Sequence, residues 1–139
     1  MNKLLEQAIA MKDEIISYRR TIHNNPEVGT ELPKTKAYVM DKLREFGYEP
    51  KEICESGIVA TIEGSKSGKT FLLRADMDAL PMAEATGLDF KSNNGSMHSC
   101  GHDMHTAMLL GAAKLLKQNQ NEIEGTVKLV FQPDEEGFT

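Results

Sequence analysis

GTVKLVFQPDEEG, residues 125–137, joins a predicted β-strand directly to three adjacent carboxylates. Residues 125–131 are mainly apolar or β-branched, which is typical of a buried strand. Asp134, Glu135 and Glu136 follow at the carboxyl end of this strand, where neighbouring negative charges raise one another's pKa unless cations compensate them. A run of charges is usually a solvated surface, but its position directly after an apolar strand favours a binding site.

Three segments upstream of this stretch have apolar residues at helical spacing. The spacing predicts helices over residues 3–23, 33–46 and 103–118, and Gly47 fits the end of the second helix. The residues expected to face inward from the second helix are Ala37, Val39, Met40 and Leu43. Those expected to be buried by the third are Met104, Met108, Leu109, Ala112 and Leu116.

Between the second and third helices the apolar pattern changes to that of short strands. Residues 57–63 and 69–75 predict two strands, and the turn-forming residues 64–68 between them indicate a hairpin. A long, weakly patterned stretch follows, and loops of such length in compact domains are usually functional. Helices first, then strands alternating with a helix, predict an α/β layered domain with a mixed β-sheet flanked by helices. Ligands collect beyond the carboxyl ends of such strands, where Asp76 and Glu135–Glu136 lie.

The composition is that of one soluble globular domain, with 139 residues of which 40% are apolar and 27% charged. The net charge of −5 argues against nucleic acid and anionic membranes as partners. No apolar run approaches the ~20 residues that span a bilayer, and the N-terminus is too charged for a signal peptide. We therefore expect a cytoplasmic protein. Since disulfides are rare in that compartment, Cys54 is expected to be a small buried hydrophobe.

The densest group of possible ligands is HSCGHD, residues 98–103. Cys100 offers a thiolate and His102 an imidazole, and Gly101 between them permits an unusual backbone turn that aims both at one ion. Alone this spacing is weak evidence. A buried cysteine beside an incidental histidine near a helix start stays open as the alternative.

A second possible group is RADMDALP, residues 74–81, at the end of a predicted strand. Asp76 and Asp78, with one residue between them, are suited to orient metal ligands through hydrogen bonds. The alternative is a simple ion pair between Arg74 and Asp76 in a turn.

Together these groups predict a metal-dependent hydrolase, because Cys, His and Glu are the side chains that bind zinc-like ions. Of two neighbouring glutamates, one can ligate the ion while the other acts as general base. One or both of the extra histidines, His98 and His105, are expected to support the site or to lie on the surface. His23, just after the first helix, is expected on the surface.

Five stretches make this sequence resemble the N-terminal part of the M20 metallopeptidase family, in the family's order and over nearly the whole chain. They are residues 19–29, 74–81, 97–103, 111–113 and 131–137. The resemblance is to the branch that acts on N-acyl amino acids, which includes aminoacylases, hippurate hydrolases, indole-acetyl-amino-acid hydrolases and N-acetyl-diaminopimelate deacetylases. It implies the N-terminal half of a zinc-peptidase catalytic domain that hydrolyses a small-molecule N-acyl amino acid.

The resemblance also implies roles for individual residues. The implied metal ligands are Cys100, His102 and Glu136. Glu135 would be the catalytic base and acid that activates water at the metal. Asp76 and Asp78 would orient the ligands, although Asp76 stands where other branches of the family carry a metal-binding histidine. The metal would be zinc or manganese, with cobalt or nickel also suited, and an intact site would hold two ions.

Members of this family are much longer than 139 residues. They add a further histidine ligand, a smaller dimerisation domain and a C-terminal return to the catalytic domain. We therefore expect residues 1–139 to be a partial metallohydrolase catalytic domain without those parts, with one ion or none and with weak or no activity. The sheet is expected to have an uncovered edge that invites pairing with another chain, and we expect a homo-oligomer.

Two other functions stay open. The first is a non-catalytic folded remnant that binds at most one metal, which the missing downstream histidines favour for this chain. The second is a thiol-based redox or metal-sensing module that uses Cys100, which the lack of a resolving cysteine close in sequence argues against.

Overall fold

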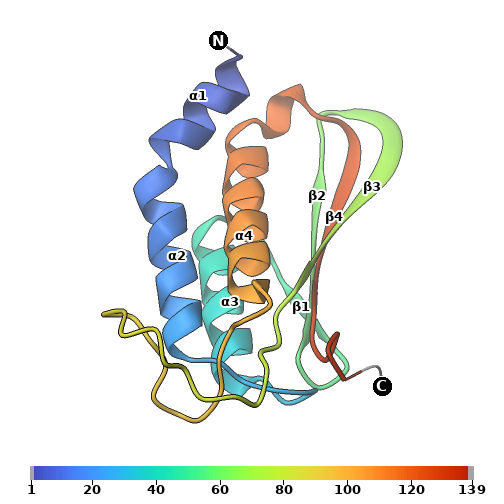
Figure 1. The fold of residues 1–139 in the computed structure, drawn as a ribbon. Coiled ribbons are helices and arrows are strands. Elements are labelled where there is room, and N and C mark those ends of the chain that lie inside the picture. Colours follow the sequence, from blue (N-terminus) through green and yellow to red (C-terminus); the bar gives the residue numbers. More distant parts are fainter. Residues whose placement is uncertain (1, 138–139) are drawn as a thin grey trace.

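The helices cover one face of a four-stranded β-sheet in the computed structural model, which describes residues 2–137 (Figure 1). The helices are α1 (Lys3–Ala10), α2 (Lys12–Asn24), α3 (Pro33–Glu45) and α4 (His102–Gln118), with a short 3-10 helix at Gln120–Glu122. The strands are β1 (Lys51–Ile53), β2 (Gly57–Glu63), β3 (Lys66–Asp76) and β4 (Glu124–Gln132). The α/β layered domain with a mixed sheet is therefore confirmed.

The strand order is β1-β2-β4-β3, so the predicted hairpin of residues 57–63 and 69–75 is wrong. Strand β4 lies between these two strands, antiparallel to β2 and parallel to β3. The turn explains the difference, because the backbone N–H groups of Gly64 and Ser65 donate to carbonyls of Gly125 and Ile123 at the start of β4. The chain therefore leaves β2 and enters the sheet again as β3 on the far side of β4.

The parallel pairing of β3 with β4 positions the site. Asp76, the last residue of β3, pairs with Gln132, the last residue of β4. Both strands thus deliver their polar continuations to the same edge of the sheet. Alternating burial along β4, with Leu129 and Phe131 fully buried, fixes this register because a slip by one residue would expose the apolar side chains.

Three sequence-based details of the helices are corrected. The helix predicted over residues 3–23 is two helices, because Met11 leaves helical geometry (φ −90°, ψ 3°) and buries its own side chain. Ala37 is exposed. Met104 and Met108 are 48% and 58% exposed, because the residues that α4 buries form a neighbouring stripe that includes Ala107 and Leu110.

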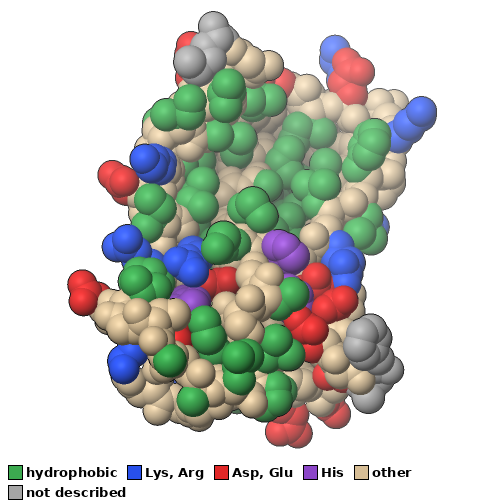
Figure 2. All heavy atoms as spheres, viewed as in Figure 1, with side chains coloured by type: hydrophobic (Ala, Val, Ile, Leu, Met, Phe, Trp, Pro, Cys, Tyr) green, Lys and Arg blue, Asp and Glu red, His purple; other side chains and the backbone are tan. Residues whose placement is uncertain are grey.

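Strand β3 is an edge strand among the described residues and carries an exposed apolar run, Phe71 to Leu73. Further exposed large apolar side chains belong to α1 and α4, and Figure 2 shows apolar side chains gathered over this side of the molecule. The expected uncovered edge is therefore present, while the homo-oligomer stays a prediction. Within residues 2–137, none of the helices has the length and apolar character needed to cross a bilayer.

We predict that Gly125→Ala strongly destabilises the fold. Gly125 has φ +104°, and a Cβ there would overlap the backbone carbonyl oxygen of Lys69 on β3. Gly95→Ala is the matched control, since Gly95 has φ +82° with no heavy atom near the new Cβ. The control should cost about 1–2 kcal/mol from backbone strain alone, and Gly125→Ala at least about 2 kcal/mol more. Urea unfolding measures both, and equal losses would contradict the prediction.

Candidate metal centre

The three predicted ligands come together from two segments of the chain. Cys100 precedes α4, His102 is its first residue, and Glu136 follows β4. One ligand atom of each lies within 4.8 Å of the others. Gly101, at φ +110°, supplies the left-handed backbone that lets Cys100 and His102 face the same point. The structure therefore assembles the predicted set, whose role as ligands stays a prediction.

His102 is held with one ring nitrogen free for a ligand. Its Nδ1 lies 2.8 Å from the backbone carbonyl oxygen of Asp78, and because a carbonyl only accepts, Nδ1 carries the proton. In the neutral imidazole the lone pair is then on Nε2. The side chain is 3% exposed, so both the tautomer and the ring orientation are fixed by the fold.

Three carboxylates surround this lone pair at distances that favour a shared cation. Nε2 lies 3.6 Å from Glu135 Oε2, 3.8 Å from Glu136 Oε1 and 3.9 Å from Asp76 Oδ2. These contacts are too long for hydrogen bonds. Two donors of one tetrahedral ion with bonds of ~2.1 Å would be ~3.4 Å apart, close to the observed separations.

The surroundings of the Glu136 carboxylate fit a divalent ion. Its Oε1 is buried and has no hydrogen-bond partner among the described residues, which is costly for a carboxylate unless a cation compensates it. The Glu136 carboxylate beside the Cys100 thiol, followed by burial and the charges of Glu136 and Glu135, raises the pKa of that thiol. Cysteine, imidazole and carboxylate are a donor set that zinc-like ions accept.

Asp78 connects the parts of the centre. Its carboxylate is buried and accepts from the backbone N–H groups of Glu135 (3.1 Å) and Glu136 (3.0 Å), while its own carbonyl accepts from His102. These contacts support the predicted orienting role of Asp78, which itself stays a prediction.

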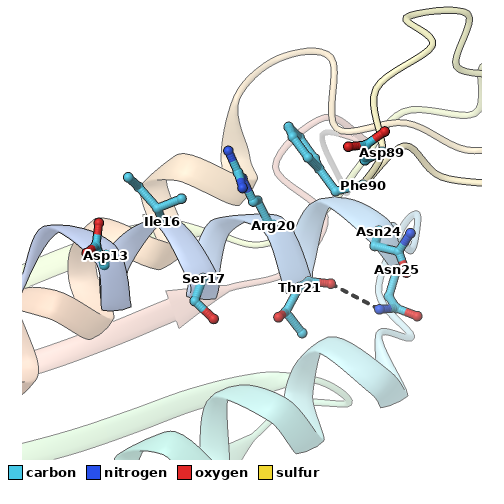
Figure 3. A pocket seen from close by; sticks show the side chains of 9 residues that line it. All are labelled: Asp13, Ile16, Ser17, Arg20, Thr21, Asn24, Asn25, Asp89 and Phe90. Atoms are coloured by element: carbon cyan, nitrogen blue, oxygen red, sulfur yellow. Dashed lines mark hydrogen bonds between the residues drawn. The ribbon is translucent and has the colours of Figure 1, made fainter.

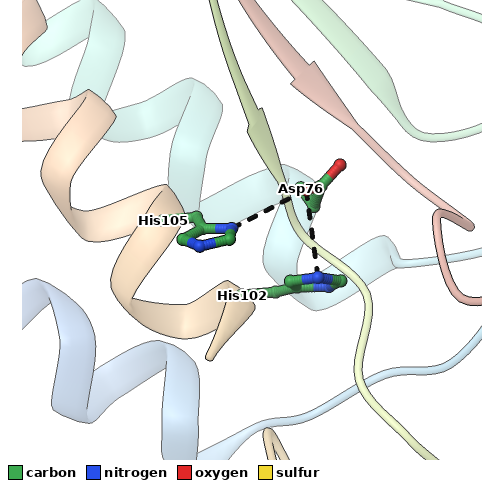
Figure 4. A group of neighbouring side chains, drawn as sticks. All are labelled: Asp76, His102 and His105. Carbon is green, nitrogen blue, oxygen red and sulfur yellow. Dashed lines mark ion pairs between the residues drawn. The ribbon is translucent and has the colours of Figure 1, made fainter. Parts of the chain in front are cut away.

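Asp76 makes the ion pair with Arg74 that the sequence allowed, and it also lies close to possible metal ligands. Its Oδ1 accepts from the guanidinium of Arg74, so the ion pair exists. Its Oδ2 faces His102 at 3.9 Å and His105 at 3.7 Å. Asp76, His102 and His105 form a second group that could hold a metal ion (Figure 4).

The expectation that His23 is a surface residue is wrong. Its side chain is 2% exposed, with Nδ1 2.8 Å from Asp103 Oδ2 and Nε2 2.9 Å from Glu84 Oε1. Arg19 Nε also donates to Asp103 at 2.7 Å. This buried network connects α2 and the loop after β3 to the first turn of α4, next to His102. Arg19 and Asp103 lie in motifs that the sequence displayed, whereas Glu84 lies in a stretch without any pattern.

Cys54 is exposed, at φ +55° in the turn after β1, and not buried as expected. The apolar residues around Cys54 have the pattern of a strand, but residues 54–56 form a turn. Of the extra histidines, His105 is exposed on α4, which agrees with a surface position, and His98 is buried. Neither ring nitrogen of His98 has a partner among the described residues. Burial, with the charges of His23 and His102, lowers the pKa of His98 to about 4 against the opposing effect of Asp103.

A pocket of ≈ 620 Å³ lies elsewhere, between α2 and the loop around Phe90 (Figure 3). It is open to solvent, and its lining includes Arg20 and Asp89. None of the residues that line it belongs to either possible metal group. The possible metal ligands therefore lie away from this pocket, at the edge of the sheet, where the pocket is smaller.

Comparison with known proteins gives a family match to this part of the chain. The model described as Peptidase family M20/M25/M40 matches residues 72–138, which include both groups of possible ligands.

Similar curated proteins include thermostable carboxypeptidase 1 of Saccharolobus solfataricus (48% identical, 98% of this chain and 35% of that protein). Hippurate hydrolase of Campylobacter jejuni is 46% identical over 97% of this chain and 35% of its own length. N-acetyl-L-cysteine deacetylase of Bacillus subtilis is 44% identical over 91% of this chain and 31% of its own length. The chain thus spans about a third of the length of the curated relatives it matches.

Two solved structures share the fold at substantial identity. A Bacillus subtilis protein described as a dinuclear metal binding peptidase from the M20 family is 40% identical, with a TM-score of 0.87 over 91% of this chain and 36% of that chain. A putative aminohydrolase from methicillin resistant Staphylococcus aureus is 39% identical, with a TM-score of 0.92 over 98% of this chain and 36% of that chain.

We predict that metal binding releases a proton from Cys100. Because the thiol pKa is raised, the group is protonated at neutral pH and must ionise to bind. Affinity for Zn²⁺ should then rise up to about tenfold per pH unit below that pKa. Titration calorimetry in two buffers of different ionisation enthalpy counts the protons. Cys100→Ala should release about one proton fewer, and an unchanged count would contradict the prediction.

We predict that the neutral state of His98 makes the metal-free protein sensitive to acid. Between the ordinary pKa of 6.5 and the folded value of about 4, the unfolded chain takes up a proton that the folded chain refuses. Stability from this group is therefore complete above pH 6.5 and falls as the pH decreases to 4, by about 3 kcal/mol in all. Urea unfolding in EDTA should show a shallower pH slope for His98→Leu, whereas equal slopes would count against the prediction.

Proposed function

Because the chain belongs to peptidase family M20/M25/M40, we propose that it is the metal-binding part of a hydrolase for N-acyl amino acids. The observation that carries this proposal is the position of His102 Nε2 among three carboxylates, with one buried Glu136 oxygen unpartnered among the described residues. In this proposal residues 1–139 are part of the catalytic domain. A divalent ion, zinc or manganese, is held by Cys100, His102 and Glu136.

Two hydrolase classes among the relatives support the substrate. Hippurate hydrolase and N-acetyl-L-cysteine deacetylase are named for N-acyl amino acids, and a thermostable carboxypeptidase is similarly related. Cleavage of either substrate breaks an amide whose nitrogen belongs to an amino acid with a free carboxylate. Removal of a C-terminal residue from a peptide is therefore the second candidate.

A bound divalent ion would supply Lewis-acid chemistry by lowering the pKa of a water and polarising the scissile carbonyl. Glu135 is the residue of this chain suited to the proton transfers. Its side chain is 36% exposed, so it reaches solvent and substrate, and its backbone N–H is fixed by Asp78. We propose that Glu135 takes a proton from the attacking water and passes it to the leaving amine. Since a thiolate ligand must stay reduced, Cys100 supports a cytoplasmic location.

The test uses a chimera, because the chain spans only 35% of the hippurate hydrolase whose activity is to be tested. This chain replaces the matching third of Campylobacter jejuni hippurate hydrolase, to which it is 46% identical over 138 residues. The chimera should hydrolyse hippurate, lose activity in EDTA and regain it with Zn²⁺ or Mn²⁺. Parallel assays with N-acetyl amino acids and unblocked dipeptides separate the two candidates. A folded, metal-loaded chimera without amidase activity would refute the proposal.

We predict that Glu135→Gln in the chimera lowers kcat by about 10²–10⁴-fold, the usual contribution of a general base, and leaves the metal content unchanged. Glu136→Gln should instead remove metal, as elemental analysis would show. Asp134→Asn is the control, since it removes a neighbouring charge that belongs to neither possible metal group. Full activity in Glu135→Gln would assign the proton transfers to another residue.

A further inference from the structure

Cys100 lies on the β3–α4 loop, the described residues 77–101, which contain no helix or strand. His102 begins α4, and Gly101 between the two has the left-handed backbone that favours glycine, at φ +110°. Because glycine is conformationally permissive, Gly101 by itself restricts the direction of the loop relative to α4 only weakly. Asp78 holds His102 from the start of the loop, but the part of the loop nearer Cys100 is held by other contacts.

His23, near the end of α2, contacts both the β3–α4 loop and the first turn of α4. Its Nδ1 lies 2.8 Å from Asp103 Oδ2, and its Nε2 lies 2.9 Å from Glu84 Oε1. The three side chains are at most 2% exposed. The His23 ring also packs edge-on against Phe90, with 5.4 Å between ring centres, and lies 6.4 Å from the ring of His98. One buried side chain thus faces three residues of the loop and one of the helix.

Glu84 is the point around which this part of the loop is folded. Its carboxylate accepts from the hydroxyl of Thr86 and from the backbone N–H of Ser92, in addition to facing His23. Although burial opposes it, hydrogen bonds from these three residues lower the pKa of Glu84 to about 2. The carboxylate is therefore ionised at neutral pH, and loss of the His23 contact would leave a buried charge without its partner from α2.

Asp103 passes the contact with His23 on to the metal centre, because it follows His102 in the first turn of α4. Its side chain is 0% exposed and accepts from Arg19 Nε at 2.7 Å. Arg19 reaches the loop by stacking over Phe90, 5.0 Å from the ring centre, whereas His23 joins two buried carboxylates. Loss of His23 would therefore break this polar connection between the loop and the helix.

We propose that His23 is a positioning residue of the metal centre, which holds the Cys100 thiol beside the His102 imidazole by joining Glu84 of the loop to Asp103 of α4. The inference rests on the proposed function for the presence of the ion. It adds a residue that contacts neither the ion nor the substrate and that sets how tightly the ion binds. Without His23, the loop is free to turn about Gly101, and the thiolate aligns with the imidazole only part of the time.

The experiment measures ion binding by the 139-residue chain and does not depend on activity. Zn²⁺ affinity is measured by competition with a coloured chelator. Bound Co²⁺ reports the ligands, because a thiolate–cobalt bond gives a charge-transfer absorption band that Cys100→Ala should lack. His23→Ala should weaken Zn²⁺ by at least about tenfold, as loss of a residue that supports metal ligands does. It should also weaken the thiolate band at saturating Co²⁺, an effect that a merely structural role would not produce.

Two conservative variants divide the connection into its halves. The side-chain amide of His23→Asn replaces Nδ1 toward Asp103, and that of His23→Gln replaces Nε2 toward Glu84. Each variant keeps one contact, so each should bind Zn²⁺ about threefold or more weakly than the wild type but more tightly than His23→Ala. Circular dichroism identifies the folded variants, and these two decide the test if His23→Ala does not fold.

Tyr48→Phe is the matched control for a loss of stability alone. The buried Tyr48 hydroxyl donates to the carbonyl of Ala113, farther along α4, at 2.7 Å. The variant therefore loses a buried hydrogen bond without touching Asp103 or the loop. It should lower the free energy of unfolding and change the Zn²⁺ affinity of the folded chain less than about twofold.

The outcomes separate this inference from the proposed function. Folded His23 variants with the Zn²⁺ affinity of the wild type, a full thiolate band in His23→Ala, or an equal loss of affinity in Tyr48→Phe would overturn the positioning role. If Zn²⁺ binding by the wild type still required Cys100 and His102, the proposed metal centre would stand without His23. A folded wild-type chain that binds no Zn²⁺ would overturn both.

Discussion

The buried Asp78 is the constraint on which the rest of the centre depends. Its carboxylate holds the backbone of Glu135 and Glu136, and its carbonyl fixes the proton of His102 on Nδ1. One residue thereby joins the segment after β3, the first residue of α4 and the segment after β4. A carboxylate satisfied by two backbone N–H groups needs no cation of its own, so Asp78 can lie beside the ligands without competing for their ion.

Around Asp78 the fold brings several negatively charged side chains together. Parallel pairing brings the end of β3 to the end of β4, so Asp76 meets Glu135 and Glu136 around the imidazole ring of His102. Arg74 neutralises only one side of Asp76. Like charges held this closely destabilise the metal-free fold, and a divalent ion converts that cost into binding energy. The repulsion between the carboxylates thus favours the binding of a cation.

A second polar network stabilises the scaffold and leaves the site free for chemistry. Asp103, immediately after His102, is held by Arg19 and His23 from α2, and Glu84 closes the network from the loop. The buried carboxylates of Asp103 and Glu84 are therefore each held by α2, and the first turn of α4 is clamped from the side opposite the sheet. Together with Asp78, these contacts position His102.

The sequence by itself determined the ligand types, the strand that precedes the carboxylates, the α/β class and the turn at Gly101, because these follow from local spacing and backbone preference. It also placed Asp76 and Glu135–Glu136 at strand ends. Only the tertiary structure decided that β4 separates β2 from β3, that His23 is buried, and that His102 faces two sets of ligands. Those features depend on contacts between segments far apart in the chain, and a hairpin-like turn or a lone histidine has the same local pattern in either arrangement.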